Sequence, residues 1–212
     1  MSPILIPNSS DGSHWNGTPK VWFEDDGPPP RPSDPMIFLL YPSGLAARRM
    51  TQLASRLGYR YDLPGQPTDT NRIHVTLGLL CRFGRLTAGT LADIDKAVSG
   101  LAMPPFLVRL DLAKNFGREK GALVLCGDEG VTGITMLREE LATAMRIIGF
   151  RKWSTRYEPH ATLNYGRCAV PEQTVDAIEW SVKELVLVCS MQGRRRHQVL
   201  GRWSLRAPAH LH

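Results

Sequence analysis

Two short segments of the chain combine a histidine and a threonine at the same spacing, each followed by a leucine. They are His74-Val75-Thr76-Leu77 and His160-Ala161-Thr162-Leu163. The chain contains only 6 histidines, so two copies of this pattern are far more informative than one. Residues two apart in a β-strand point to the same face, so each segment would direct one imidazole and one hydroxyl together. Two such strands side by side would place both pairs around one small volume.

This set of side chains suits a phosphate ester. Threonine hydroxyls can donate hydrogen bonds to the non-bridging phosphate oxygens. A histidine with its ordinary pKa of about 6.5 can act as a base when neutral and as an acid when charged. The motifs therefore indicate acid–base chemistry at phosphorus, with one imidazole neutral and the other protonated.

Other interpretations of the motifs are open at this point. A single histidine on a strand is more often a packed core or surface residue than a catalytic one. A metal site is a weaker alternative, because two histidines without neighbouring carboxylates or thiolates make a poor ligand set and zinc usually takes three or four protein ligands. A structural or interaction domain would require both motifs to be accidental.

The elements expected around the motifs recur in a similar order in each half of the chain. Apolar runs and alternating apolar residues predict strands at 36–41, 72–77, 106–112, 122–125, 160–163, 182–189 and 199–205. Apolar residues at helical spacing predict a first helix capped by Ser43 and stopped by Gly58, a second opened by Thr87 and a third ended by Gly149. Each half thus runs from strand to helix to loop to motif strand. This predicts an α+β fold of two lobes around a pseudo-two-fold axis, with the motif strands facing a cleft.

Composition divides the chain into a folded region and two tails. Residues 1–35 are rich in proline and polar residues and predict a flexible N-terminal tail. We expect the folded domain to span 36–206, with 207–212 as a C-terminal tail.

Charge and cysteine content bound the classes of function. The net charge of +6 favours an anionic ligand, although a merely soluble basic surface is an equal alternative. No apolar run approaches the roughly 18 residues that a membrane helix needs, and the first residues lack the basic flank of a secretory signal. The cysteines have neither zinc-binding nor disulfide-scaffold spacing, so we expect reduced thiols in a cytoplasmic protein; they are Cys81, Cys126, Cys168 and Cys189.

The chain resembles the 2H phosphoesterase superfamily, in particular its 2′-5′ RNA ligase-like, cyclic phosphodiesterase branch. The resemblance covers about residues 36–206 and rests on segments shared with the family, which are the two motifs, Tyr157-Glu158-Pro159 before the second motif, Asn115-Phe116-Gly117-Arg118, and the closing stretches 185–190 and 200–205. Two positions depart from the family pattern. Tyr165 stands where members often carry an arginine, and His197 stands near the place of a usual tyrosine.

The resemblance implies a two-lobed α+β fold in which antiparallel sheets flank a central cleft and helices lie outside. It implies hydrolysis of 2′,3′-cyclic phosphates to 2′-phosphates and, in some relatives, reversible joining of 2′-5′ linkages in RNA. It implies no metal and no nucleotide cofactor. His74 would be the general acid and His160 the general base, with Thr76 and Thr162 completing the catalytic set.

Residues near the motifs are candidate substrate contacts, because an aromatic ring together with a cation commonly holds single-stranded nucleotides. The candidates are Phe116, Arg118, Arg156, Tyr157 and Tyr165. Ordinary loop contacts are the alternative for these positions. We expect RNA ends or nucleotide 2′,3′-cyclic phosphates as partners of a monomer without membrane attachment. The alternative function is a binding module of the same fold that holds a nucleotide or RNA end without turnover.

Overall fold

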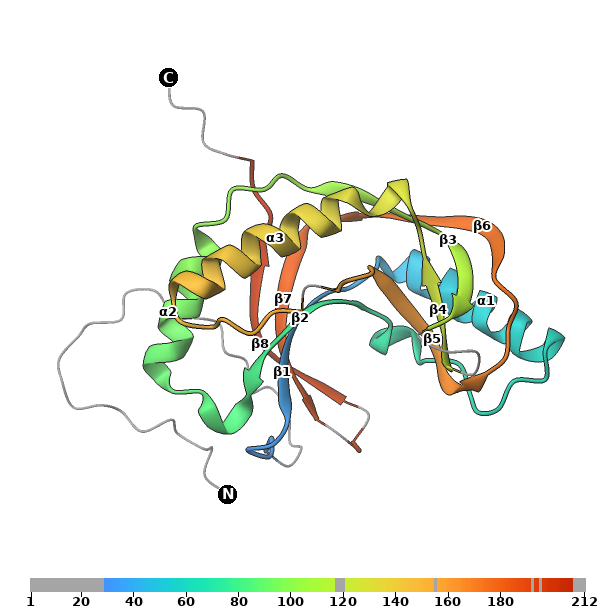
Figure 1. Ribbon diagram of the computed structural model, residues 1–212, viewed down its shortest axis with the longest axis horizontal. Coiled ribbons are helices and arrows are strands. Elements are labelled where there is room, and N and C mark those ends of the chain that lie inside the picture. The colour runs from blue at the N-terminus through green and yellow to red at the C-terminus, as the bar shows by residue number, and fades with distance from the viewer. Residues whose placement is uncertain (1–28, 117–120, 155, 192, 195, 208–212) are drawn as a thin grey trace.

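A computed structural model describes residues 29–116, 121–154, 156–191, 193–194 and 196–207 (Figure 1). The strands are β1 (Pro35–Leu40), β2 (Val75–Arg82), β3 (Phe106–Asn115), β4 (Gly121–Cys126), β5 (His160–Cys168), β6 (Gln173–Val182), β7 (Glu184–Met191) and β8 (Arg196–Ser204). The long helices are α1 (Gly44–Arg60), α2 (Ala88–Ser99) and α3 (Thr132–Ile147). The α+β class expected from the sequence is confirmed.

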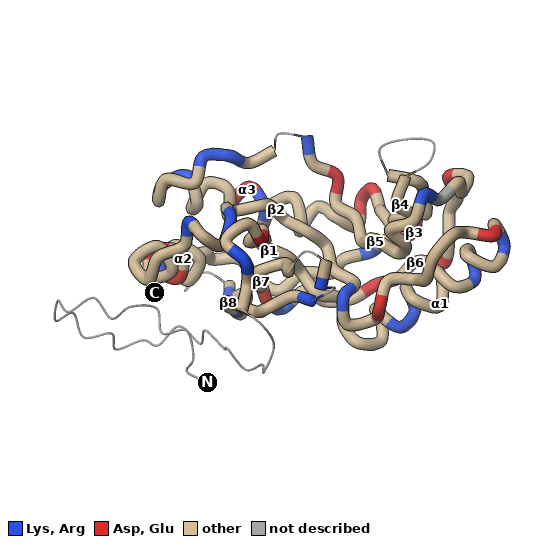
Figure 2. The backbone as a smooth tube through the Cα atoms, turned by 90° about the horizontal axis from the view of Figure 1, so that it is seen from below, with Lys and Arg blue, Asp and Glu red and all other residues tan. Residues whose placement is uncertain are grey.

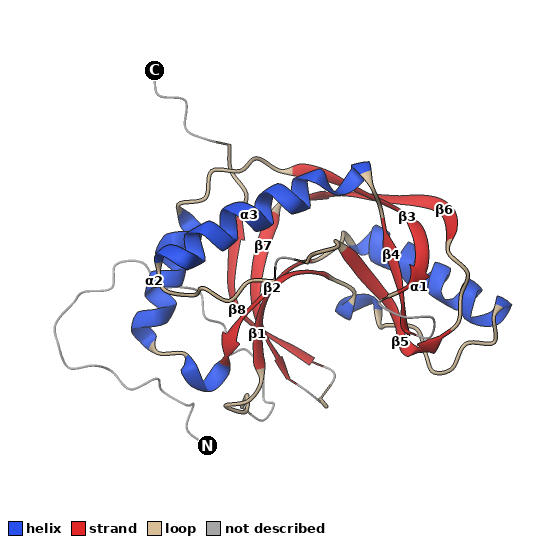
Figure 3. Ribbon diagram, in the orientation of Figure 1, coloured by secondary structure: helices blue, strands red, loops and turns tan. Residues whose placement is uncertain are grey.

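All described strands belong to one antiparallel sheet with the order β6-β3-β4-β5-β2-β1-β7-β8. The motif strands β2 and β5 are neighbours at its centre, and Val75–Ala161 is their one registered pair. Every other pair of neighbouring strands is joined by a longer ladder of registered residues, as β7 and β8 are. The sheet therefore consists of two four-stranded halves, β6-β3-β4-β5 and β2-β1-β7-β8, which diverge from this junction (Figure 3).

The helices cross between the two halves. Helix α1 follows β1 in the chain but packs against β5 and β6 of the other half. Helix α3 follows β4, starts beside β3 and reaches β2 and α2, which lie with the opposite half. Each half of the sheet is therefore packed against a helix that follows a strand of the other half in the chain. The two halves therefore form one domain.

Local sequence accounts for three helix ends as predicted, whereas Gly58 does not stop α1, which runs on to Arg60. The Ser43 hydroxyl accepts a hydrogen bond from the N–H of Ala46 at 3.3 Å at the start of α1. The Thr87 hydroxyl accepts from the N–H of Thr90 at 3.1 Å at the start of α2. Gly149, with φ of 97°, follows α3 in the left-handed conformation that glycine adopts without a Cβ clash.

The sequence did not predict one strand, β6, and the strands expected at 72–77 and 182–189 are wrong at their starts. β2 begins only at Val75, after a 3-10 turn at Thr70–Arg72. Val182 is the last residue of β6, and β7 begins only at Glu184. The signal for β6 was present, because Ile178, Trp180 and Val182 are buried while the residues between them are exposed. β6 is an edge strand with many polar side chains, and these obscure the alternation in the sequence.

Two apolar clusters lie on opposite faces of the sheet. The main core fills the space between the sheet and the helices and includes Phe38 of β1. The second cluster consists of Leu39, Val186 and Val188, with β1 and β7 pairing Leu39 to Val186. Successive residues of a strand point to opposite faces, so this second cluster shares the face that carries the motif side chains.

Charged residues of both signs are spread along the described chain. Figure 2 shows Lys and Arg positions interspersed with Asp and Glu along the backbone of both halves. No helix among the described residues is long and apolar enough to cross a bilayer.

The expected N-terminal tail falls mostly outside the described residues. Within its described part, Asp34 is buried, and its carboxylate accepts a hydrogen bond from the N–H of Arg31 at 2.8 Å. The carbonyl of Asp34 also accepts from the N–H of Phe83 at 2.8 Å. The packed chain therefore begins before residue 36. Residues 208–212 of the expected C-terminal tail lie outside the described residues.

Candidate active site

The two motifs meet at the junction of the sheet halves. Val75 of β2 pairs with Ala161 of β5, and both side chains are buried in the core. The motif histidines and threonines flank this pair in sequence, so strand alternation directs all of them to the opposite face. The structure thus brings together the groups that the sequence analysis singled out.

The antiparallel pairing also determines which motif groups are cross-strand neighbours. Because Val75 lies opposite Ala161, extending the antiparallel register by one residue sets His74 across from Thr162 and Thr76 across from His160. A phosphate at this place would meet both motifs at once.

Both motif imidazoles are oriented by the same kind of hydrogen bond. The Nδ1 atom of His74 lies 2.7 Å from the carbonyl oxygen of Arg72. The Nδ1 atom of His160 lies 2.8 Å from the carbonyl oxygen of Glu158. A carbonyl only accepts, so Nδ1 carries the proton in each ring and donates it. The Nε2 atom is left in both rings for chemistry.

Each motif histidine also has a second ring against it. Phe116, at the end of β3, stacks on His160 with ring centroids 4.2 Å apart and planes inclined by 29°. His197 of β8 contacts His74 edge to face, with centroids 4.9 Å apart and planes inclined by 72°. Both neighbours restrict the rotation of the imidazoles. In the sequence, His197 stood out only as a departure from the family pattern.

Burial sets the electrostatic environment of His74. It lowers the pKa of His74, and the nearby positive charges of Arg72 and protonated His160 act in the same direction, while the hydrogen bond to the Arg72 carbonyl opposes them. These influences favour the neutral form of His74 in the ligand-free protein. A neutral imidazole is ready to accept a proton, whereas the resemblance assigns His74 the acid role.

A β-bulge in β2 brings a further residue to the motif face. Thr76 pairs with Leu39 of β1, but Gly78 pairs with the adjacent Phe38, so β2 holds one extra residue here. Phe38 points into the core, and Gly78 therefore lies on the core side. Alternation then returns Leu79 to the face of Thr76, where its side chain is 48% exposed.

β5 has the same irregularity at the equivalent place. Thr162 pairs with Val124 of β4, but Asn164 pairs with the adjacent Leu123. Leu123 belongs to the core, and Asn164 is buried with it. Tyr165 is therefore turned to the face of Thr162, and it is 59% exposed. The bulge places this candidate substrate contact on the motif face, which the motif spacing alone does not reveal.

The loop before β5 supports β2. The hydroxyl of Tyr157 donates to the carbonyl of Thr76 at 3.0 Å. Arg138 of α3 lies over the Tyr157 ring at 4.2 Å and donates to the carbonyl of Leu77 at 3.0 Å. Tyr157, expected as a substrate contact, thus uses its hydroxyl to hold the backbone of the first motif.

The loop before β2 supports β5 in a comparable way. The N–H of Thr68 donates to the carbonyl of Leu163 at 2.8 Å. The side-chain amide of Asn164 donates to the carbonyl of Pro64 at 3.2 Å. Each motif strand is therefore fastened by the loop that leads to the other motif, and this fixes the two histidines relative to each other.

The remaining candidate contacts differ in how the structure places them. Phe116 is 40% exposed beside His160, and Arg156 is exposed in the loop before β5. Arg118 lies outside the described residues. The sequence analysis missed Lys114, whose ammonium pairs with the carboxylate of Glu158 at 2.5 Å. That ion pair brings a cation beside the segment that holds His160.

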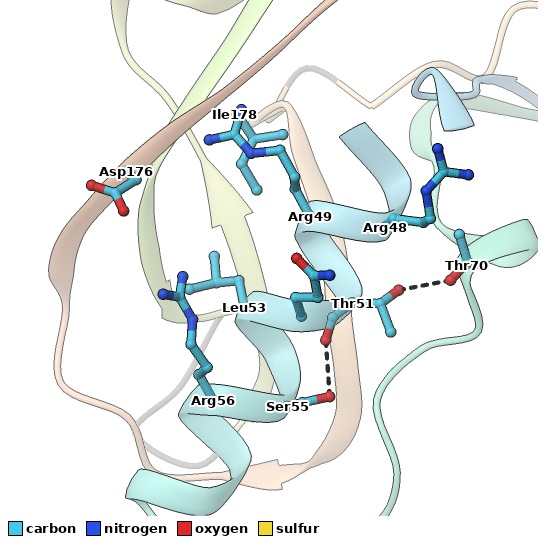
Figure 4. A pocket seen from close by; sticks show the side chains of 10 residues that line it. Arg48, Arg49, Thr51, Leu53, Ser55, Arg56, Thr70, Asp176 and Ile178 are labelled. Carbon is cyan, nitrogen blue, oxygen red and sulfur yellow. Dashed lines mark hydrogen bonds between the residues drawn. The ribbon is translucent and has the colours of Figure 1, made fainter. Parts of the chain in front are cut away.

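A hollow of about 700 Å³ lies elsewhere in the described structure. It runs between α1 and β6 and is lined by arginines 48, 49 and 56 and by Asp176, among others (Figure 4). It contains no histidine. We place the candidate active site at the motifs because acid–base groups, not volume, decide what chemistry is available. Among the described residues, no group of three or more His, Cys, Asp or Glu side chains is arranged to hold a metal ion.

A search of the curated proteins finds no match. Several solved structures have the same fold. The chain is similar to a protein solved as a phosphoesterase, with 21% identity and a TM-score of 0.67 over 82% of this chain and 99% of that one. It is similar to Escherichia coli LigT bound to 3′-AMP, with 19% identity and a TM-score of 0.67 over 81% and 98% of the chains. It is similar to TT0787 of Thermus thermophilus, with 20% identity and a TM-score of 0.68 over 82% and 98%.

Two antiparallel half-sheets with paired histidine–threonine motifs at their junction define the 2H phosphoesterase class of fold. The model of the 2′-5′ RNA ligase superfamily matches residues 42–194. The chain belongs to the 2′-5′ RNA ligase superfamily, and this membership indicates an enzyme of the phosphoesterase or ligase type.

Proposed function

We propose that the protein is a metal-independent phosphodiesterase that opens 2′,3′-cyclic phosphates on RNA ends or nucleotides and leaves a 2′-phosphate. The observation that carries the proposal is the pairing of two backbone-anchored imidazoles with two hydroxyls on one face. The LigT structures with 3′-AMP, ATP and NADP+ support a nucleotide as the kind of ligand.

The phosphate would lie between the motifs. The hydroxyls of Thr76 and Thr162 would donate to its non-bridging oxygens and stabilise the charge that builds up on them in the transition state. One Nε2 would take a proton from water as the water oxygen bonds to phosphorus. The other Nε2 would give a proton to the ribose 3′-oxygen as its bond to phosphorus breaks. The product is a 2′-phosphate monoester with a free 3′-hydroxyl.

We keep the order of roles that the resemblance implies, with His74 as acid and His160 as base. The lowered pKa of His74 belongs to the ligand-free protein. A bound phosphodiester carries a negative charge, which raises the pKa of an adjacent imidazole and favours its protonated form. Each proton transfer typically contributes about 10² to 10⁴ in rate.

Aromatic residues of the half-sheet β6-β3-β4-β5 would hold the base or ribose of the ligand. Phe116 and Tyr165 are both exposed on or beside the face that carries His160. Stacking on such rings is tolerant of base identity. Arg156 and Arg118 remain candidate phosphate contacts. Tyr157 instead stabilises β2, because its hydroxyl donates to the carbonyl of Thr76.

A binding module without turnover is the alternative function. All four motif side chains are present and share one face, and this favours the enzyme. Joining of a 2′-5′ linkage follows the same two-histidine reaction when an RNA 5′-hydroxyl replaces water as the nucleophile and the ribose 3′-oxygen leaves, so ligase activity is expected with such an acceptor.

The first experiment is turnover of adenosine 2′,3′-cyclic phosphate in excess EDTA, with wild type, His74→Gln and His160→Gln compared side by side. We expect wild type to produce 2′-AMP at a rate that EDTA leaves unchanged, and each variant to lose activity by about 10² or more. Loss of activity in EDTA that a divalent cation restores would show that the reaction depends on a metal ion. Binding of the nucleotide without product in wild type would favour the binding module.

A further inference from the structure

The candidate site contains a third histidine whose place in the fold is fixed by β8. His197 pairs with Ser190 of β7, and Val199, two residues on, packs against the apolar cluster of Leu39, Val186 and Val188. That cluster shares the face of Thr76, with which Leu39 pairs. His197 is therefore on the motif face, and its ring contacts His74.

Tyr41 holds the His197 ring in this position. The hydroxyl oxygen of Tyr41 lies 3.1 Å from Nδ1 of His197. Burial raises the pKa of Tyr41, so its hydroxyl keeps its proton. A phenol is a good donor and a neutral imidazole nitrogen a good acceptor, so the hydrogen bond runs from Tyr41 to His197. The remaining nitrogen of His197, Nε2, then carries the ring proton.

His197 is an uncharged ring in this setting. Burial, with smaller contributions from the positive charges of protonated His74 and of Arg72, lowers the pKa of His197 to about 4. Its hydrogen-bond partner, the hydroxyl of Tyr41, is uncharged as well. His197 therefore covers one side of His74 without adding a charge near neutral pH.

We propose that His197, held by Tyr41, is a positioning residue that packs against His74 and keeps its Nε2 directed at the phosphate. The hydrogen bond to the Arg72 carbonyl holds the His74 ring at Nδ1 alone. The edge-to-face contact from His197 adds a second restraint on the orientation of the ring. On the other half-sheet, Phe116 plays the equivalent part for His160 by stacking on its ring.

A direct proton-transfer role for His197 fits the arrangement less well. Its Nδ1 is occupied by Tyr41, and its protonated form is scarce at neutral pH. The two motif histidines already supply one acid and one base. Positioning of His74 is what the contacts of His197 provide, and this inference rests on the proposed function of His74.

The test compares three variants with wild type. His197→Ala removes the ring, His197→Phe keeps an aromatic ring but loses the hydrogen bond, and Tyr41→Phe loses only the hydroxyl. Tyr59→Phe is the matched control for the last change, because Tyr59 is 95% exposed on α1. The pKa of His74 is measured by NMR titration of its ring protons in the ligand-free protein, and kcat and KM are measured with adenosine 2′,3′-cyclic phosphate.

We expect His197→Ala to admit water beside His74, which raises the His74 pKa toward its ordinary value, and to lower kcat on the order of ten-fold with little change in KM. His197→Phe should keep the His74 pKa low and recover much of kcat, and Tyr41→Phe should lower kcat less than His197→Ala does. Tyr59→Phe should match wild type.

Two results would overturn the proposal in a variant whose circular dichroism and melting match wild type. One is a His74 pKa and kcat that His197→Ala leaves unchanged. The other is a rise in KM at constant kcat, which would make His197 a ligand contact instead. The NMR titration requires no turnover, so an inert wild type would count against the proposed function while the contact between the two rings is still tested.

Discussion

Leu79 and Tyr165 occupy equivalent positions in the two halves of the sheet. Each follows its motif histidine by five residues, and each is returned to the motif face by a β-bulge between the threonine and itself. The side chains differ in chemistry, because one is aliphatic and the other aromatic. The motif face thus carries the same histidine and threonine on each half of the sheet but different side chains beside them.

This asymmetry predicts that nucleotide binding depends on Tyr165 more than on Leu79. Stacking of a base on an aromatic side chain contributes about 1–3 kcal/mol, so Tyr165→Ala should weaken binding of 2′-AMP by roughly ten-fold. Leu79→Ala is the matched control and should change the dissociation constant little. Calorimetric titration of both variants measures this difference, and equal effects at the two positions would contradict it.

The hydroxyl of Thr76 is expected to act on the transition state and not on folding. Thr76→Val keeps the branched shape but removes the donor, so kcat should fall by about 10²-fold while KM and melting temperature change little. Thr76→Ser keeps a hydroxyl and should recover most of the activity. Steady-state kinetics decide the point, and a Val variant as active as the Ser variant would remove Thr76 from the mechanism.

The pH dependence of turnover should report the pair of imidazoles. Profiles of kcat/KM give the macroscopic pKa values of the free enzyme, whichever histidine is acid or base. Burial lowers the pKa of His74, so the acidic limb should have its midpoint below 6.5. In the profile of kcat the bound phosphate anion should move this limb to higher pH. A rate that rises without falling between about pH 5 and 9 would argue against the two-histidine mechanism.

Two glycines should respond to alanine in opposite directions. A Cβ at Gly78 would collide with the Trp153 ring, so Gly78→Ala should destabilise the fold and disturb the β2 bulge. A Cβ at Gly58 of α1 would meet open space, and alanine there should stabilise the helix by about 0.5–1 kcal/mol. Urea unfolding of both variants provides the comparison. A tolerated Gly78→Ala would mean that Trp153 moves freely.

Acid should destabilise the folded protein through its buried histidines. The pKa of His74 and that of His197 are lowered by burial in the folded state, so the unfolded chain binds more protons between those values and 6.5. Stability is then fully present above pH 6.5 and declines as the pH falls toward about 4. Melting temperatures measured across this range should fall less in His197→Phe than in wild type, and parallel curves would contradict the assignment.

The sequence by itself determined the chemistry and the elements that carry it. Period-two alternation in His-x-Thr predicts that an imidazole and a hydroxyl share a face, because strand geometry is local. Capping by Ser43 and Thr87 is likewise a local interaction between neighbouring residues, and the structure bears out both helix starts. The polar edge strand β6 escaped prediction because its local pattern is weak.

Only the tertiary structure decided which groups meet across the junction. The pairing of Val75 with Ala161, the bulges that turn Leu79 and Tyr165 to the motif face, and the contact of His197 with His74 all join residues far apart in the chain. Such contacts depend on register and on how the halves pack, and local propensity carries no information about either. His197 lies beside His74 because β8 pairs with β7 and β7 pairs with β1.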